Sequence, residues 1–284
     1  MDSRTYELFE DNFDFRLIFP DTWMIGTKSA AQPMSCDCYL VIGRERAVLI
    51  DSGMSTLNIK DYIDELGLCD VPIAGVINTH SHFDHSGGNG FFGHAWMSEK
   101  AKKGATTPFG PADGYLLDYP IDFVKEGDVI DLGDRKLEIF EIGAHDPSSI
   151  AILDRSRRIL FSGDELETGW INVGSMGKAK NPASTIEQHY YNMKKLESLL
   201  PYYDAICCGH HGSPIAKESI YHFLKCDEMI LSGVPGDAYI PYKTAGGHPL
   251  GEAARVMRYK SAHICYSQEH IYITTKEDFK KKQK

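Results

Sequence analysis

The sequence predicts an α/β domain of layered sheets, and three observations lead to this prediction. Short strand-like runs rich in β-branched and aromatic residues alternate with segments whose apolar residues recur at helical spacing. Several of the strand-like runs end at a histidine or an aspartate, which would place polar side chains along one rim of a sheet. No long linker or low-complexity stretch divides the 284 residues, so we expect one domain over residues 1–284.

The first third of the chain contains strands, one helix and a turn. Residues 13–51 read as strands, with "GRER" separating two apolar runs as a hairpin turn does. Residues 55–67 carry apolar side chains at helical spacing and end at Gly67, which suits a helix C-terminus. Residues 71–80 are then a buried strand that delivers a histidine to its end, and we expect the glycine-rich residues 86–93 to form a flexible turn.

The middle of the chain repeats this pattern. Residues 122–143, 149–154 and 158–164 read as strands joined by turns that contain glycine and aspartate. The stretch "PASTIEQHYYNMKKLESLL" reads as a helix with a capping box, in which Ser184 is the N-cap and Glu187 follows three residues later.

The remaining segments complete the expected architecture. Residues 203–212 predict a strand that ends in histidines, residues 217–226 a short helix, and residues 261–275 terminal strands. Residues 101–122 and 167–182 are rich in glycine and proline. Because long irregular segments in compact domains are commonly functional, we expect these two insertions to act as active-site lids.

Composition narrows the possible partners and the compartment. A net charge of −10 argues against a nucleic-acid partner, and no apolar run approaches the roughly 18 residues of a membrane span. Seven cysteines without a C-x-x-C pair predict buried or half-buried free thiols, which fits a cytoplasmic protein. The terminal "KKKQK" reads as a frayed tail.

The stretch "VINTHSHFDHSGG" places four good metal ligands close together: His80, His82, Asp84 and His85. If extended structure persists, His80 and His82 face the same side and can share one cation, whereas the other two could reach a second cation. Imidazole and carboxylate donors suit zinc, iron or manganese. Surface or capping residues that cluster by chance would be an adequate explanation for one histidine, but not for four residues at this spacing.

Further candidates follow other strand-like runs. "IGAHDPSS" carries His145, "RILFSGD" ends at Asp164, and "ICCGHHG" carries His210 and His211. Each of them alone could be an ordinary capping residue, but their recurrence at strand ends predicts that they meet at one site.

These motifs together resemble the metallo-β-lactamase superfamily. "THSHFDHSGG" is similar to its HxHxDH signature, and "AVLIDSG", "AHDPSS", "LFSGD" and "GHHGSP" resemble its other motifs in the expected order. The resemblance covers residues 35 to 215. It implies a four-layer αβ/βα sandwich, in which two mixed β-sheets face each other, helices flank them, and a metal site lies at one sheet edge.

The resemblance also implies two divalent metal ions, Zn²⁺ being the first choice and Mn²⁺ or Fe the alternatives. It implies seven ligands: His80, His82 and His145 on one ion, Asp84, His85 and His210 on the other, and Asp164 bridging both. The usual motif is Gly-His-Gly, whereas this chain has two adjacent histidines, and we favour His210 over His211 because it directly follows the glycine.

Three further residues near the motifs need an interpretation. Asp51 either orients a ligand histidine or only forms the turn before Ser-Gly. Asp146 and Ser148 depart from the family pattern His-Thr-Pro-Gly-Ser, and Asp146 adds a carboxylate close to the expected site.

The implied function is that of a metal-dependent hydrolase. A metal-bound hydroxide would attack a small carbonyl ester, thioester or lactone, and Asp84 would orient it and take part in proton transfer. The alternatives are a phosphodiesterase and an iron-dependent, oxygen-using oxidoreductase on the same fold. The partner is then a small-molecule substrate, which Trp170 and Tyr190 are candidates to contact, and self-association into a homo-oligomer is compatible with the sequence.

Overall fold

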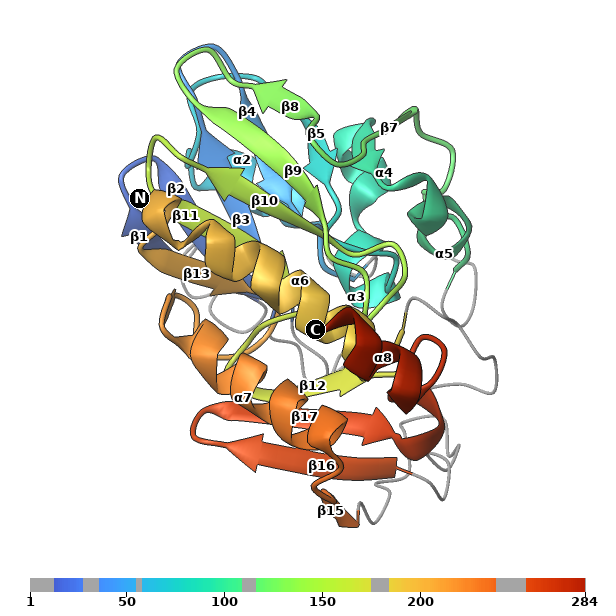
Figure 1. Ribbon diagram of the computed structural model, residues 1–284. Coiled ribbons are helices and arrows are strands. Elements are labelled where there is room, and N and C mark those ends of the chain that lie inside the picture. The colour runs from blue at the N-terminus through green and yellow to red at the C-terminus, as the bar shows by residue number, and fades with distance from the viewer. Residues whose placement is uncertain are drawn as a thin grey trace.

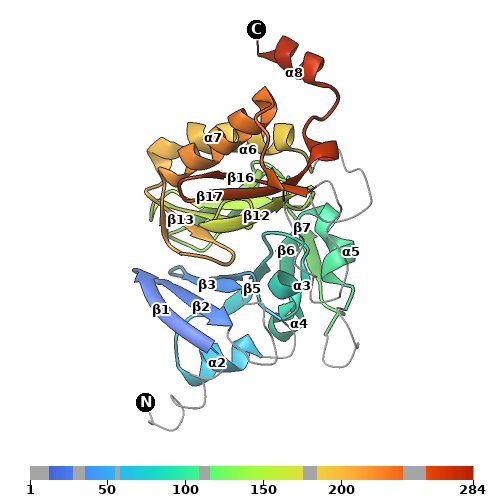
Figure 2. The ribbon, with the colours of Figure 1, turned by 90° about the horizontal axis from the view of Figure 1, so that it is seen from below.

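Two β-sheets lie face to face and helices cover their outer sides, as Figures 1 and 2 show for the computed structural model. The structure describes residues 13–27, 36–54, 58–108, 116–174, 184–238 and 254–283. Within these ranges the strands form a seven-stranded sheet, a six-stranded sheet and a four-stranded C-terminal sheet, in the orders β1-β2-β3-β4-β5-β6-β7, β14-β13-β11-β10-β9-β8 and β12-β17-β16-β15.

The strands have the following bounds: β1 Phe13–Phe19, β2 Thr22–Thr27, β3 Asp37–Ile42, β4 Ala47–Ile50, β5 Ile73–Ile77, β6 Ala95–Met97, β7 Ile121–Phe123, β8 Val129–Asp131, β9 Lys136–Glu141, β10 Ile150–Asp154, β11 Ile159–Gly163, β12 Gly169–Val173, β13 Ala205–Cys208, β14 Ile215–Ala216, β15 Asp237–Ala238, β16 Ala254–Tyr259 and β17 Ala262–Ser267.

The α-helices are α2 Ile59–Glu65, α3 Phe83–Ser86, α4 Asn89–Phe92, α5 Lys102–Ala105, α6 Ile186–Ser198, α7 Ser219–Ser232 and α8 Lys276–Lys282. No helix among the described residues has the length and apolar character needed to cross a membrane.

Three hydrophobic clusters account for the layers. The central cluster lies between the seven- and six-stranded sheets and joins side chains such as Tyr39 and Ile50 to Ile152 and Phe161. A second cluster packs α2 on the outer face of the seven-stranded sheet. A third packs α6 and α7 on the outer faces of the other two sheets. The order of layers is therefore helix, sheet, sheet, helix, and the predicted αβ/βα sandwich is confirmed (Figure 2).

The second half of the sandwich contains two sheets, whereas the sequence predicted one. β11 pairs in parallel with β13, whereas β12 turns away and pairs in parallel with β17. The C-terminal strands thus form a sheet of their own, with β12 at one edge. Residues 254–259, which were not predicted as a strand, form β16 in this sheet, while residues 268–275 do not continue the terminal strands.

Several local predictions need correction. The turn predicted over residues 86–93 is confined to residues 87–88 and 93, because α3 and α4 occupy most of the segment and Gly87 itself has helical backbone angles. The N-cap of α6 is Thr185 and not Ser184, since the Thr185 side chain accepts a hydrogen bond from the backbone N–H of Gln188. The "KKKQK" end is not simply frayed, since α8 includes its three leading lysines.

The two expected lids are only partly irregular. Residues 102–105 form α5 and residues 169–173 form β12, so these parts are regular elements of the fold. Residues 109–115 and 175–182 lie outside the described residues, and a lid role for them stays a prediction. None of the seven cysteines is in a disulfide, and six are buried and Cys69 half-buried, as predicted.

Arg135 is a buried cation that the sequence analysis did not single out. Its guanidinium donates to the Asp154 carboxylate at 2.7 Å, and both side chains are fully buried. It also donates to the backbone oxygens of Asp21 and Ile42 and to the Thr22 hydroxyl. This one side chain therefore ties the edge of one sheet to the other.

We expect Arg135→Met to lower the free energy of unfolding by about 3–5 kcal/mol, because it leaves the Asp154 carboxylate buried without its cation. Chemical denaturation monitored by circular dichroism measures this loss. The control is Arg155→Ala, which breaks a half-exposed pair with Glu138 and should cost less than about 1 kcal/mol. Equal losses for the two variants would contradict the assignment of Arg135 as the buried tie between the sheets.

A second buried pair joins α6 to α7. His189 Nδ1 lies 2.8 Å from Asp227 Oδ2, and both side chains are fully buried. Burial lowers the pKa of His189, but the neighbouring Asp227 carboxylate outweighs this effect and raises the pKa to about 9. The protonated pair therefore adds stability that is complete below about pH 6.5, the ordinary pKa of histidine, and is lost as the pH rises through about 9.

We expect the free energy of unfolding to fall between pH 6.5 and 9 more steeply in the wild-type chain than in Asp227→Asn, whose His189 lacks the carboxylate that holds its proton. Urea titrations of both proteins at several pH values, in one metal-free buffer, measure the two slopes. Parallel slopes would show that the His189–Asp227 pair does not titrate in this range.

Candidate metal centre

The predicted ligands lie where strands end, at one edge of the sandwich. Four follow β5, one lies in the β9–β10 connection, one follows β11 and one follows β13: in that order, His80, His82, Asp84 and His85; His145; Asp164; His210. β4 pairs in parallel with β5, and β11 with β13, so the carboxyl ends within each pair meet at the same edge.

The first ligand group contains His80, His82, His145 and Asp164. His80 Nε2 lies 2.9 Å from His82 Nδ1, which lies 3.1 Å from His145 Nε2. Asp164 Oδ2 is 3.9 Å from His80 Nε2 and 3.6 Å from His145 Nε2. Three ring nitrogens and one carboxylate oxygen thus converge on one point.

The reason that His80 and His82 meet differs from the predicted one. β5 ends at Ile77, three residues before His80, so no strand carries both histidines. His82 has extended backbone angles and is the residue before α3, whose first turn then presents Asp84 and His85. The turn of the chain and the short helix α3 bring the four side chains together. The predicted cause, alternation of side chains along a strand, does not apply here.

The second ligand group contains Asp84, His85 and His210. His85 Nε2 lies 3.3 Å from His210 Nε2, and Asp84 Oδ2 is 3.7 Å from the first ring and 3.4 Å from the second. Asp164 also reaches this group, since its Oδ1 is 3.3 Å from His85 Nε2 and its Oδ2 is 3.2 Å from His210 Nε2. The Asp164 carboxylate therefore adjoins both groups.

These donors fit divalent cations. Zinc bonds of 2.0–2.1 Å in a tetrahedral site separate neighbouring donor atoms by roughly 3.3 Å, close to the spacings within each group. Asp164 Oδ1 is buried and accepts no hydrogen bond from the residues that the structure describes. An unsatisfied buried carboxylate oxygen is costly, and a cation in contact with it would remove that cost.

Asp51 supports His85 from behind. Its Oδ2 lies 2.8 Å from His85 Nδ1, and the backbone N–H and hydroxyl of Thr79 donate to the same carboxylate at 2.8 and 2.7 Å. Asp51 also has a left-handed backbone, with φ at 56°, directly after β4. These contacts support the interpretation that Asp51 orients the ring of His85.

The surroundings set the charge of the rings. Burial lowers the pKa of His145 to about 4, so this ring is neutral at ordinary pH and one of its nitrogens can bind a cation. Burial also lowers the pKa of His80 well below the usual value. At His210 burial acts in the same direction, but Asp164 outweighs it and raises the pKa to about 10. The Asp164 carboxylate therefore attracts the His210 ring of the second group more strongly than the His145 ring of the first.

The other predicted residues lie outside the two groups. His211 belongs to neither, and its ring centre is 5.9 Å from that of His210. Tyr190 lies on α6 and packs against Tyr191 and Phe279, at the margin of the hydrophobic cluster that this helix covers. Trp170 lies on β12, where its neighbour Ile171 faces the core, so the Trp170 side chain points to the opposite face of that sheet.

Asp146 lies at the rim of the first group, as expected from its sequence position. Its Oδ2 accepts a hydrogen bond from the Ser81 hydroxyl at 3.2 Å and lies 3.8 Å from His82 Nε2. Two acids that the sequence analysis passed over, Glu165 and Glu167, are buried directly after Asp164. The signal that could have revealed them is the stretch "GDELE", which puts three carboxylates into four positions at the end of a fully buried strand.

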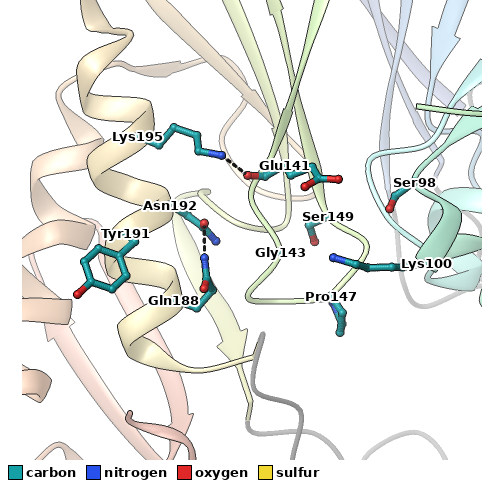
Figure 3. Close-up of a pocket in the computed structure, with 10 residues that line it drawn as sticks. All are labelled: Ser98, Lys100, Glu141, Gly143, Pro147, Ser149, Gln188, Tyr191, Asn192 and Lys195. Atoms are coloured by element: carbon teal, nitrogen blue, oxygen red, sulfur yellow. Dashed lines mark hydrogen bonds between the residues drawn. The ribbon is translucent and has the colours of Figure 1, made fainter. Parts of the chain in front are cut away.

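A polar pocket of about 280 Å³ adjoins the loop that carries His145 (Figure 3). Gly143, Pro147 and Ser149 of that loop line it on one side, and Gln188 and Tyr191 of α6 line it on another. A molecule in this pocket would contact the loop that holds His145 and would not itself lie among the ligand side chains.

Comparisons with known proteins agree with this geometry. The family model for the metallo-beta-lactamase superfamily matches residues 31–210. An acyl-coenzyme A thioesterase MBLAC2 of Gallus gallus is 31% identical over 159 residues, which cover 46% of this chain and 57% of that protein. A hydroxyacylglutathione hydrolase of Synechococcus is 26% identical over 174 residues, 58% of this chain and 62% of that protein. The chain therefore spans less than two thirds of the length of these relatives.

Solved structures share the fold. A metallo-beta-lactamase family protein from Thermus thermophilus has a TM-score of 0.61 at 19% identity, covering 76% of this chain and 82% of that one. A beta-lactamase domain protein from Burkholderia ambifaria has a TM-score of 0.62 at 16% identity, covering 77% and 76%. With a family model that matches more than half of its length, the chain belongs to the metallo-beta-lactamase superfamily.

Proposed function

We propose that this chain is a hydrolase that holds two divalent metal ions and cleaves thioester bonds. The observation that carries the proposal is the pair of adjoining ligand groups that share the Asp164 carboxylate. Relatives named acyl-coenzyme A thioesterase and hydroxyacylglutathione hydrolase support the choice of a thioester among the carbonyl substrates that such a site could accept.

The residues of each group would hold one ion. His80, His82 and His145 would bind the first, Asp84, His85 and His210 the second, and Asp164 would contact both. Imidazole and carboxylate donors without a thiolate suit Zn²⁺, Mn²⁺ and Fe. Zn²⁺ is the first choice because the donor spacings within each group are close to those of a tetrahedral zinc site, and Mn²⁺ and Fe are the alternatives. Divalent ions in such a site lower the pKa of a bound water toward ~7 and polarise a carbonyl oxygen.

Asp84 is the protein group that we assign to proton transfer. Its side chain is buried and its Oδ2 faces His85 and His210, so it lies inside the site and not at its rim. There its carboxylate would orient the attacking water and accept the proton that this water loses. The thiolate leaving group of a thioester is weakly basic, so its departure needs no strong protein acid.

The surrounding side chains orient the ligands. Asp51 accepts a hydrogen bond from His85 Nδ1. The other ring nitrogen, Nε2, faces the second group and would bind the cation there. The backbone oxygen of Asn172 does the same for His145 Nδ1 at 2.9 Å. Seven cysteines that form no disulfide, most of them buried, support a reducing compartment such as the cytoplasm as the place of action.

We expect the purified chain to contain up to two divalent ions and to hydrolyse acyl-coenzyme A and acylglutathione thioesters. Mass spectrometry of the metal content and a thiol-release assay measure both properties on one preparation. Chelation should abolish turnover, and zinc or manganese should restore it. Turnover of lactones or of bis-p-nitrophenyl phosphate, but of no thioester, by the metal-loaded protein would overturn the substrate assignment, and iron without zinc or manganese would favour oxidoreductase chemistry.

His210 and His211 are a matched pair of neighbours for testing the ligand assignment. We expect His210→Ala to remove one ion or to weaken its binding at least about tenfold, because this ring lies in the second group, and to lower thioester turnover accordingly. His211→Ala should keep both ions, because that ring belongs to neither group. Competition with a chromophoric chelator measures the affinities, and the reverse order of effects would exchange the two assignments.

A further inference from the structure

The segment that follows Asp164 buries two more carboxylates than the ligand groups use. Glu165 is fully buried, and Glu167 is 3% exposed. Buried acids are rare unless they are paired or hydrogen-bonded. No salt bridge to a lysine or arginine is found for either of them in the described part of the chain. Their hydrogen bonds go instead to backbone amides of two neighbouring loops.

Glu165 holds the loop between β9 and β10. Its Oε1 accepts hydrogen bonds from the backbone N–H groups of Ala144 at 2.8 Å and of His145 at 2.7 Å. This loop is the one that directs the His145 ring into the first group. The position of the His145 backbone is therefore set by the residue next to Asp164.

Glu167 holds the turn after β13. Its Oε2 accepts a hydrogen bond from the backbone N–H of His210 at 3.0 Å. The next residue, Thr168, donates from its hydroxyl to the backbone oxygen of His211 at 3.0 Å. The turn that carries His210 is thus fixed to the same segment, two residues beyond Glu165.

The segment itself is anchored on its other side. The backbone oxygen of Glu165 lies 3.0 Å from His189 Nε2, and His189 is paired with Asp227. α6 and α7 therefore hold the segment firmly while its two carboxylates hold the loops. A ligand displaced by even a fraction of an ångström loses metal-bond geometry, so such supports affect metal affinity strongly.

We propose that Glu165 and Glu167 are positioning residues that fix the His145 loop and the His210 turn to the segment of Asp164, so that each ligand group depends on one of them. This inference rests on the proposed metal sites and extends them. Glu165 acts on the group of His80, His82 and His145, whereas Glu167 acts on the group of Asp84, His85 and His210. Neither glutamate is a metal ligand.

Alanine variants test the proposal through metal binding, independently of turnover. Glu165→Ala and Glu167→Ala should each weaken the binding of one ion by about tenfold to hundredfold, the usual effect of removing a group that orients a metal ligand. Equilibrium competition between the 284-residue chain and a chromophoric chelator for Zn²⁺ measures these affinities. Far-ultraviolet circular dichroism checks that each variant is folded.

Glutamine variants and a remote glutamate serve as controls. Glu165→Gln and Glu167→Gln keep an oxygen that can accept the same amide hydrogen bonds, so they should bind metal more tightly than the alanine variants. If the alanine variants do not fold, metal binding by the glutamine variants serves as the test. Glu187 is also buried and accepts a backbone N–H bond, but from Ile273 near the C-terminus. Glu187→Ala should lower the melting temperature and leave metal affinity unchanged to within about twofold.

Double variants separate local positioning from general destabilisation. Adding Glu167→Ala to His210→Ala should cost no further affinity, because Glu167 acts through His210, whereas adding Glu165→Ala should cost its full effect. Full additivity in both combinations overturns the proposal, as does wild-type affinity in both single alanine variants. A wild-type chain that binds no metal would instead overturn the proposed function itself, together with this extension of it.

Discussion

The burial of a charged carboxylate among imidazole rings is the constraint that governs this molecule. Asp164 is 8% exposed, and one of its oxygens accepts no hydrogen bond from the described residues. Such a group is stable only where opposite charge or a cation is held close to it. The strand ends and loops around it serve this requirement by delivering histidines, and the fold holds those loops in place with further buried polar contacts.

In the sandwich, the proposed ligands from both sheets lie at one edge, around the Asp164 carboxylate. β5 and α3 supply ligands from the seven-stranded sheet, and β11 and β13 supply them from the six-stranded sheet. The apolar cluster between the sheets fixes their separation, and the buried Arg135 joins their edges through Asp154, at the end of β10 opposite the His145 loop. Because each ligand group takes side chains from both sheets, packing between the sheets sets the distances among the side chains within each group.

The convergence of the seven proposed ligands could be predicted from the sequence because these residues follow local rules. Strand-like runs that end in His or Asp are visible in a short window of sequence, and the order of the motifs resembles a known family. The capping of α6, the helical turn at Asp84 and the separate C-terminal sheet escaped prediction for a different reason. Thr185 and Ser184 are equally good caps by type, and β12 has no local feature that selects β17, far along the chain, as its partner. Likewise, Arg135 and Glu165 look like ordinary surface charges until distant backbone groups are placed beside them.

The pairing of β12 with β17 has an evolutionary consequence. The matched family region ends at residue 210, yet β17 lies beyond it and is hydrogen-bonded to the strand whose Asn172 oxygen fixes the ring of His145. The C-terminal part of the chain therefore supports a proposed ligand that lies in the matched region. Divergence in β17 can change how the His145 ring is held without altering any of the seven proposed ligands.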